Sequence, residues 1–222
     1  MTTALHYEAL KERQRNLRHD FPETMGLRVH RAISWIGRAE QCGNDEDARF
    51  IFLWISFNAA YADETDFQGT TISERATFIN FFNKLAQHDM KEKTIYTALW
   101  HRFSGPIRTL MNNHYIFHQF WQHQNGMEGF ENWEETFQTS TRSFQQAFQD
   151  GNVSKVLRFV FDRLYVLRNQ LVHGGATWNS RINRHQVRDG AAILAFLMPL
   201  FVQIMMANPH ENWGRPFYPV VD

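Results

Sequence analysis

Two residue types suited to acid–base chemistry on a phosphodiester lie close together near the end of one predicted helix. The run RNQLVHGG places Arg168 five residues before His173, with Asn169 directly after the arginine. Histidine titrates near neutral pH, and arginine stays charged and offers a planar fork of donors to phosphate oxygens. When a 2′-OH attacks a neighbouring phosphate, one group accepts a proton and another neutralises the added negative charge. His173 and Arg168 fit these two roles, and Asn169 could orient the imidazole or bind a phosphate oxygen.

The spacing alone leaves a second interpretation open. Arg168 could bind a carboxylate while His173 caps carbonyls at a helix end, as a purely structural pair. On an ideal helix the two side chains also point about 140° apart. Either the helix ends before His173 and the following Gly174-Gly175 pair lets it swing, or the site combines residues from two chains related by a twofold axis.

A long helix from about Val153 to Val172 must position these residues. One apolar stripe marks its core face, formed by Val153, Val156, Leu157, Val160, Leu164, Leu167 and Leu171. Widely spaced turn signals favour helices over strands along the whole chain. The sequence predicts an all-α protein with helices near residues 4–18, 25–41, 46–63, 71–87, 91–103, 113–124, 130–149, 153–172 and 183–208, and with breaks at 104–106 and at Gly126 and Gly129.

Length and composition exclude several classes of protein. The chain has 222 residues, equal numbers of basic and acidic residues (23 each), and one cysteine, Cys42. An apolar share of 43% can build a sizeable core, and we expect a single domain over 1–222 with its core bundle at roughly 25–208 and an N-terminal helix at 4–18. The lone cysteine cannot form an internal disulfide, and the polar N-terminus has no apolar leader, so we expect a cytoplasmic protein.

One apolar stretch, residues 191–207, could be mistaken for a membrane span. It is shorter than the roughly 20 apolar residues that a bilayer requires, and Pro199 and Gln203 interrupt it. We therefore predict a buried core helix and no membrane association.

The R-N-x-x-x-H block at the end of a long helix resembles the signature of the HEPN superfamily. FLWISFNAAY at 52–61 and GATWNSRINRHQVRDGA at 175–191 are similar to the bacterial Apea-like group of stand-alone HEPN proteins. The resemblance implies an antiparallel HEPN-like helical bundle with additional helices that forms a homodimer. It also implies a metal-independent endoribonuclease with its catalytic arginine and histidine, Arg168 and His173, at the dimer cleft, in a bacterial toxin, stress or anti-phage defence role.

Members of that superfamily that work with a nucleotidyltransferase antitoxin often carry a tyrosine two residues after the motif histidine. Gly175 stands there in this chain, which argues against tyrosine-directed AMPylation by such an antitoxin. A separate regulatory or antitoxin protein is still expected as a partner, because the bundle takes up nearly the whole chain.

Charge along the chain favours a polyanionic partner more than the net charge of zero does. Between residues 155 and 188 a single acidic residue, Asp162, stands among seven basic ones, which are Lys155, Arg158, Arg163, Arg168, Arg181, Arg184 and Arg188. We expect RNA contacts from Lys155, Arg158, Arg181 and Arg184, and base or lid contacts from Trp178 in a predicted loop. The alternative is a solvated helix face that pairs with acidic neighbours.

No metal or other cofactor is expected. His114 and His118 have a two-ligand spacing with His123 nearby, but no further ligand is evident. The leading hypothesis is an endoribonuclease that leaves a 2′,3′-cyclic phosphate and a 5′-OH. The alternative is a non-catalytic module that binds RNA, a nucleotide or a protein through the same cleft.

Overall fold

The computed structural model describes residues 5–62, 71–216 and 218–220, and in the helix that starts at residue 71 it describes side chains from residue 78 onward. Regular structure in these residues is helical, with no strand among them, so the all-α prediction is confirmed. The elements in chain order are α1 (Tyr7–Leu17), η1 (Arg18–Asp20), α2 (Glu23–Glu40), α3 (Glu46–Tyr61), α4 (Thr71–His88), α5 (Thr94–Thr97), the π-helical turn η3 (Ala98–Arg102), α6 (Ser104–Met111), η4 (His114–Ile116), α7 (His118–Gln124), α8 (Trp133–Gln149), α9 (Val153–Val172) and α10 (Arg184–Ala207).

Side-chain caps fix the starts of two central helices. The Asp45 carboxylate accepts a hydrogen bond from the backbone N–H of Ala48 (3.0 Å) and starts α3. The Asn152 side chain accepts one from Lys155 N–H (3.0 Å) and starts α9. Each cap satisfies an N–H that has no partner within its helix. The bounds of α9 are those expected from the sequence.

The prediction of a break at residues 104–106 is wrong, because α6 begins there. Proline lacks a backbone N–H, but N–H groups in the first turn have no intrahelical acceptor, so Pro106 fits in the first turn of α6. The single helix expected at 113–124 is also wrong. It is split into η4 and α7 because Phe117 between them is extended (φ −111°, ψ 126°).

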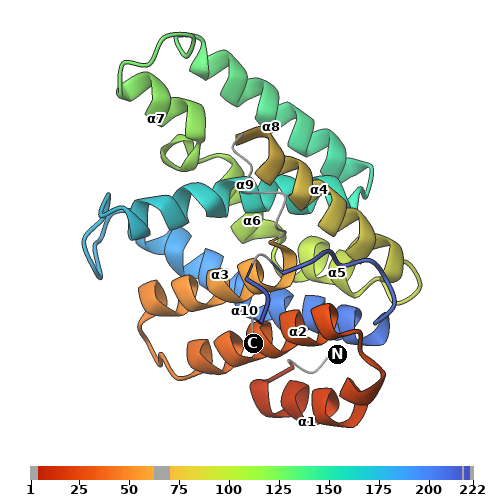
Figure 1. Ribbon diagram of the computed structural model, residues 1–222. Coiled ribbons are helices and arrows are strands. Elements are labelled where there is room, and N and C mark those ends of the chain that lie inside the picture. The colour runs from red at the N-terminus through yellow and green to blue at the C-terminus, as the bar shows by residue number, and fades with distance from the viewer. Residues whose placement is uncertain (1–4, 63–70, 217, 221–222) are drawn as a thin grey trace.

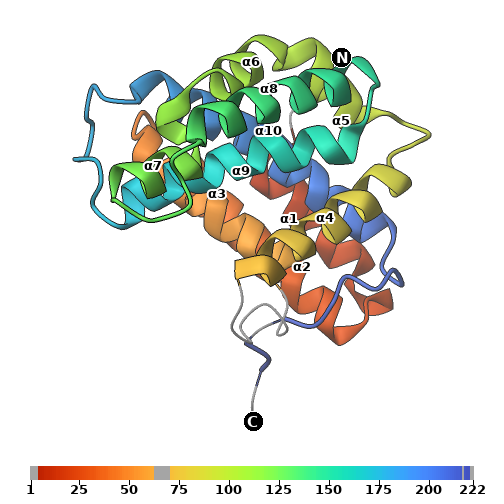
Figure 2. The same ribbon diagram turned by 90° about the horizontal axis from the view of Figure 1, so that it is seen from above.

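Helix α9 lies across the middle of the molecule (Figure 1). It packs against α4, α8, α6 and α3, while α3 packs against both α2 and α10. Figure 2 shows α8 and α9 running alongside each other, and the segment between α9 and α10 projecting from one side of the molecule. The end of α9 therefore lies at the edge of the bundle.

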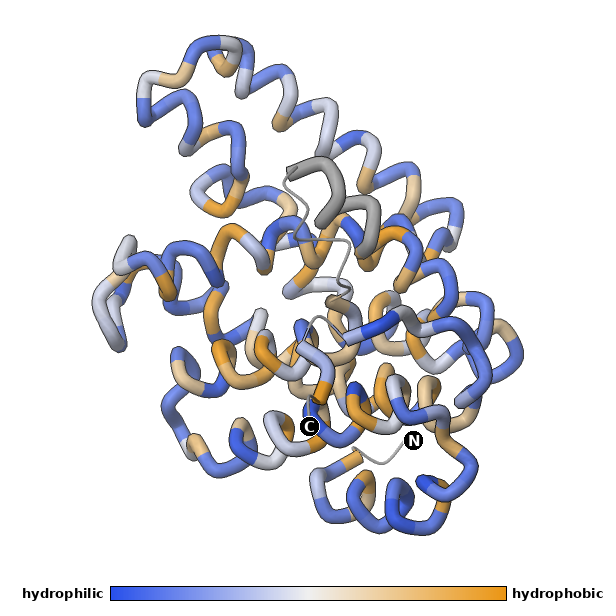
Figure 3. Tube along the Cα trace, viewed as in Figure 1, coloured by the Kyte–Doolittle hydropathy of each residue, from blue (hydrophilic) through white to orange (hydrophobic). Residues whose placement is uncertain are grey.

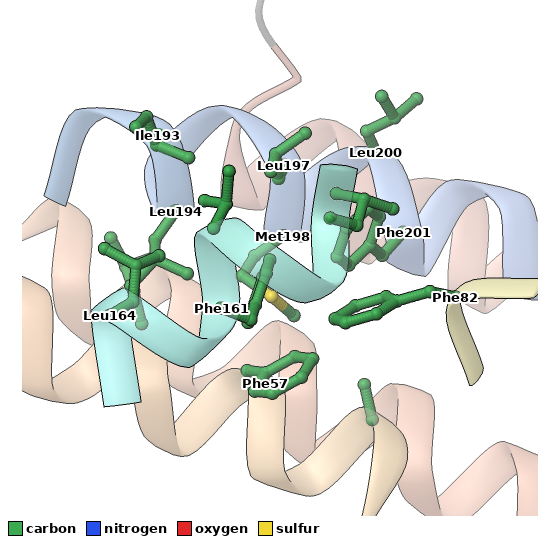
Figure 4. Packing of buried hydrophobic residues seen from close by; sticks show 14 of the residues in the cluster. Phe57, Phe82, Phe161, Leu164, Ile193, Leu194, Leu197, Met198, Leu200 and Phe201 are labelled. Carbon is green, nitrogen blue, oxygen red and sulfur yellow. The ribbon is translucent and has the colours of Figure 1, made fainter. Parts of the chain in front are cut away.

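Aromatic rings from four helices meet in the core. The ring of Phe161 on α9 is 4.4 Å from that of Phe57 on α3 and 4.9 Å from that of Phe82 on α4, between ring centroids. Phe201 on α10 lies 6.1 Å from Phe161 (Figure 4). All four side chains are fully buried. Together they hold the inner part of α9 in place while its end reaches the surface.

Helix α10 is long and apolar enough to cross a membrane, judged by length and composition alone. In the structure, 72% of its most apolar window is buried against the rest of the protein. Hydrophobic stretches of α3, α9 and α10 face one another in the interior, whereas α8 and α1 carry many hydrophilic residues (Figure 3). The expectation that this stretch is a core helix is thus confirmed.

The core reaches beyond the 25–208 expected for it. Leu10 on α1 is fully buried, and Trp213, after α10, is 5% exposed. Arg28 on α2 is also fully buried. It holds the segment after α10 against α2 by donating hydrogen bonds to the carbonyls of Gly214 (3.1 Å) and Arg215 (2.7 Å).

Candidate functional site

The chain leaves its helical conformation at His173. Its backbone N–H still donates to the Asn169 carbonyl (2.9 Å), but its dihedrals (φ −94°, ψ 12°) are no longer helical. Gly174 follows with φ +71°, a conformation that glycine adopts at little cost. The helix therefore ends before His173, as the first of the two arrangements expected from the sequence requires.

The arginine of the block is held by its neighbour. Arg168 Nη1 donates to Asn169 Oδ1 (2.7 Å), and the guanidinium lies 5.7 Å from the centre of the Tyr165 ring. Arg168 and Asn169 are both half-buried. Asn169 therefore orients the arginine in this structure, not the imidazole of His173.

His173 is exposed at the end of α9. Among the residues that the structure describes, none hydrogen-bonds or forms an ion pair with its ring. The arrangement thus presents one exposed imidazole and one guanidinium fixed by an amide, both in the last part of the same helix. Such groups can bind and protonate a phosphodiester that approaches from solvent.

Gln170 links the end of α9 to two neighbouring segments. Its Nε2 donates to the Tyr115 carbonyl in η4 (2.7 Å), and its Oε1 accepts from Asn183 Nδ2 (3.1 Å) just before α10. Trp121 Nε1 on α7 donates to the same Tyr115 carbonyl (2.7 Å). These bonds bring η4, α7 and the start of α10 to the candidate site.

Large apolar side chains are exposed on the segments that these bonds join and on the loop before α10. They are Tyr115 (50% exposed), Trp121 (37%), Val172 (53%), Trp178 (73%) and Ile182 (74%), and we call them the apolar rim. Exposed apolar side chains on neighbouring segments are candidates for contacts with a second protein.

The predicted RNA-binding residues do not form one continuous strip. Lys155 and Arg181 are exposed, whereas Arg158 is half-buried with its guanidinium 4.9 Å from the Phe159 ring. Arg184 Nη2 donates to both carboxylate oxygens of Asp47 (2.7 and 3.0 Å), a partner on α3. Arg184 therefore pairs with an acidic neighbour, which is the alternative to an RNA contact that the sequence left open.

The loop residue Trp178 is also engaged within the protein. Its Nε1 donates to Asp45 Oδ2 (3.1 Å), and the backbone N–H of Asn179 donates to Asp47 Oδ2 (3.0 Å). The carboxylates in the first turn of α3 thus hold this loop, although the indole face is still exposed.

Sequence reasoning placed Arg163 in the basic strip, but its side chain is only 3% exposed. Its guanidinium lies 4.5 Å from the Phe117 ring and 5.4 Å from the Phe137 ring. The spacing of its neighbours in the sequence could have indicated this burial. Phe159 stands four residues before Arg163 and Val166 three residues after it, so both lie on the same side of the helix as Arg163, and both are buried.

The histidines considered as metal ligands are separated by the extended Phe117. The His114 ring packs 5.0 Å from Phe120 and 5.8 Å from Trp133, between ring centroids. Within the described part of the chain, no group of three or more His, Cys, Asp or Glu side chains is arranged to hold a metal ion.

The chain matches no family model, no curated protein and no solved structure. The local geometry and the resemblance noted in the sequence are therefore the basis for assigning a function.

Proposed function

We propose that this protein is a homodimeric, metal-independent endoribonuclease of the HEPN kind, with Arg168, Asn169 and His173 at its catalytic site. The observation that carries the proposal is the presence, in the last part of α9, of an exposed imidazole and of a guanidinium held by Asn169. His173 exchanges a proton with the 2′-OH or the leaving oxygen. Arg168 neutralises the charge that develops on the phosphate. The products are a 2′,3′-cyclic phosphate and a 5′-OH.

The apolar rim supports the dimeric part of the proposal. Val172 directly precedes His173, so a second copy that covers the rim brings its own α9 end close to the first. A closed twofold pairing would place two sets of these residues around one groove. Exposed Lys155 and Arg181 would add phosphate contacts whose strength falls with salt.

The setting of this activity also belongs to the proposal. We place the protein in the bacterial cytoplasm, in a toxin, stress or defence role, under the control of a separate regulatory protein. This part rests on the sequence resemblance alone.

Cleavage of labelled RNA in buffer with EDTA tests the proposal. His173→Ala and Arg168→Ala should each abolish cleavage while the protein stays folded. The matched controls His19→Ala and Arg15→Ala remove the same residue types from exposed positions on and after α1, and they should cleave at the wild-type rate. Cleavage retained by both site variants would end the assignment.

Mixing the two inactive variants tests whether the site spans two chains. A heterodimer of Arg168→Ala with His173→Ala keeps one complete pair of residues if each site takes one residue from each chain. Random reassociation should then restore about a quarter of the wild-type activity, because half of the dimers carry one of two sites. No recovery, with dimers present by light scattering, would place each site within one protomer.

The non-catalytic binding module is the second candidate. It is favoured by the absence, among described residues, of any group that orients the His173 ring within the protomer. Binding of labelled RNA without the appearance of new 5′-OH ends would identify it.

A further inference from the structure

A buried cation without a hydrogen-bonding partner lies away from the end of α9. Arg163 is 3% exposed, and both Nε and Nη2 are buried without an acceptor. No described carboxylate lies within ion-pair distance of its guanidinium. Burying a charge in this way is unfavourable, and most buried polar groups in proteins have a partner.

The aromatic rings of Phe117 and Phe137 compensate part of this cost. A guanidinium 4.5 Å from a ring centre gains a cation–π attraction, but the ring supplies no hydrogen-bond acceptor. Burial lowers the pKa of the Arg163 guanidinium to about 10, so the group still carries its charge at neutral pH. The Nε and Nη2 donors of this charged group have no hydrogen-bond acceptor among the described residues.

Arg163 lines a pocket between α7, α8 and α9 that is open to solvent. The volume of the pocket is about 110 Å³, which is roughly the space of three or four water molecules. Other polar groups at its wall are the imidazole of His118, the amide of Gln119 and the hydroxyls of Thr136 and Ser140. This volume is large enough for a phosphate group.

We propose that this pocket binds a phosphate group, with Arg163 as its charge partner and Ser140 as a hydrogen-bond donor. Guanidinium groups bind phosphate oxygens through charge-assisted hydrogen bonds. The phosphate is either the free ion or the terminal group of a nucleotide whose remainder stays outside. This site does not depend on the proposed nuclease activity.

The carboxylate of Asp162 competes with a bound phosphate for the charge of Arg163, because it also lines the pocket and acts on Arg163 electrostatically. Its presence predicts moderate affinity, so the titration must reach millimolar phosphate.

Thermal melting of the full chain with inorganic phosphate tests the site, against sodium chloride of equal ionic strength. The melting temperature should rise in a saturable way with phosphate and not with chloride. Arg163→Met should raise the half-saturating concentration roughly tenfold or more, because it removes the charge and keeps most of the unbranched apolar stem of the side chain. Arg142→Met, on α8 outside the pocket, is the matched control and should respond like the wild type.

A second variant and a second readout keep the test decisive. Ser140→Ala on the surface of α8 should weaken the phosphate response while the fold is kept. In NMR spectra, the Nε–H resonance of Arg163 should shift as phosphate is added.

Adenosine monophosphate distinguishes the two sources of the phosphate group. Tighter binding than that of inorganic phosphate identifies a nucleotide as the ligand, and equal binding identifies the free ion. A phosphate response equal to that of chloride, or one unchanged in Arg163→Met, would overturn the proposal.

Discussion

At the scale of single residues, burial and pairing decide what each charged group can do. Arg184 and Arg181 are three positions apart in a basic stretch, yet Arg184 is held by a carboxylate at 2.7 Å and Arg181 is exposed. A guanidinium engaged with both oxygens of Asp47 has little capacity left for a phosphate. Of these two, Arg181 is therefore the better candidate for an RNA contact, and Arg184 positions the loop before α10.

Replacing Asp47 tests this assignment. Asp47 is 7% exposed and also accepts the backbone N–H of Asn179, so Asp47→Ala leaves Nη2 of Arg184 and this N–H without an acceptor. We expect a loss of about 1.5–3 kcal/mol in the free energy of unfolding, the range for hydrogen bonds to charged groups. Urea denaturation gives the value.

Asp20→Ala is the control, because Asp20 is exposed and should contribute less than about 0.5 kcal/mol. In a double-mutant cycle, Asp47→Ala combined with Arg184→Ala should cost less than the sum of the single changes. Additive costs would show that the two side chains are not coupled.

At the scale of helices, a glycine lets α10 approach two partners closely. A Cβ added at Gly190 would lie 2.8 Å from the Phe50 ring on α3 and 2.9 Å from a methyl group of Leu164 on α9. Both side chains are fully buried and have no room to move away. The distance between α10 and the helix that carries the candidate site therefore depends on this residue.

Gly190→Ala should lower the free energy of unfolding by about 1–3 kcal/mol, because overpacking forces side chains or backbone to shift. Gly105 in the first turn of α6 has nothing within 4 Å of an added Cβ. Gly105→Ala should therefore be neutral or slightly stabilising. Equal denaturation midpoints for the two variants would contradict the close packing of α10.

At the scale of the whole molecule, the segment after α10 fastens distant parts of the chain to one another. The Glu211 carboxylate lies 2.9 Å from Nε2 of His88 at the end of α4, and Trp213 packs edge-on against Phe81, 5.9 Å between ring centroids. The hydrogen bond from His88 and the charge of Lys84 lower the pKa of Glu211 below its ordinary value of 4.5.

This lowered pKa predicts the direction of a pH effect. Since the folded protein favours the ionised carboxylate, the stabilisation from Glu211 is fully present above the unfolded pKa of 4.5 and is lost as pH falls through the lower folded pKa. Glu211→Gln should thus melt below the wild type near neutral pH, and the difference should shrink in acid. Melting curves across this range check it, and a difference that stays constant below pH 4.5 would refute it.

The sequence by itself determined the helical class, the bounds of α9 and its apolar stripe. Hydrophobic periodicity acts between residues a few positions apart, so it can be read along the chain. The start of α6 at Ser104 was missed, because a Ser-Gly-Pro run fits a turn as well as the first turn of a helix.

Only the tertiary structure decided which charged groups face solvent and which are paired. The partners of Arg184 and Trp178 lie more than a hundred residues away in the chain, on α3. Arg163 is buried by rings from the segments before α7 and on α8. These contacts depend on how helices distant in sequence pack together, and short-range patterns hold no information about that packing.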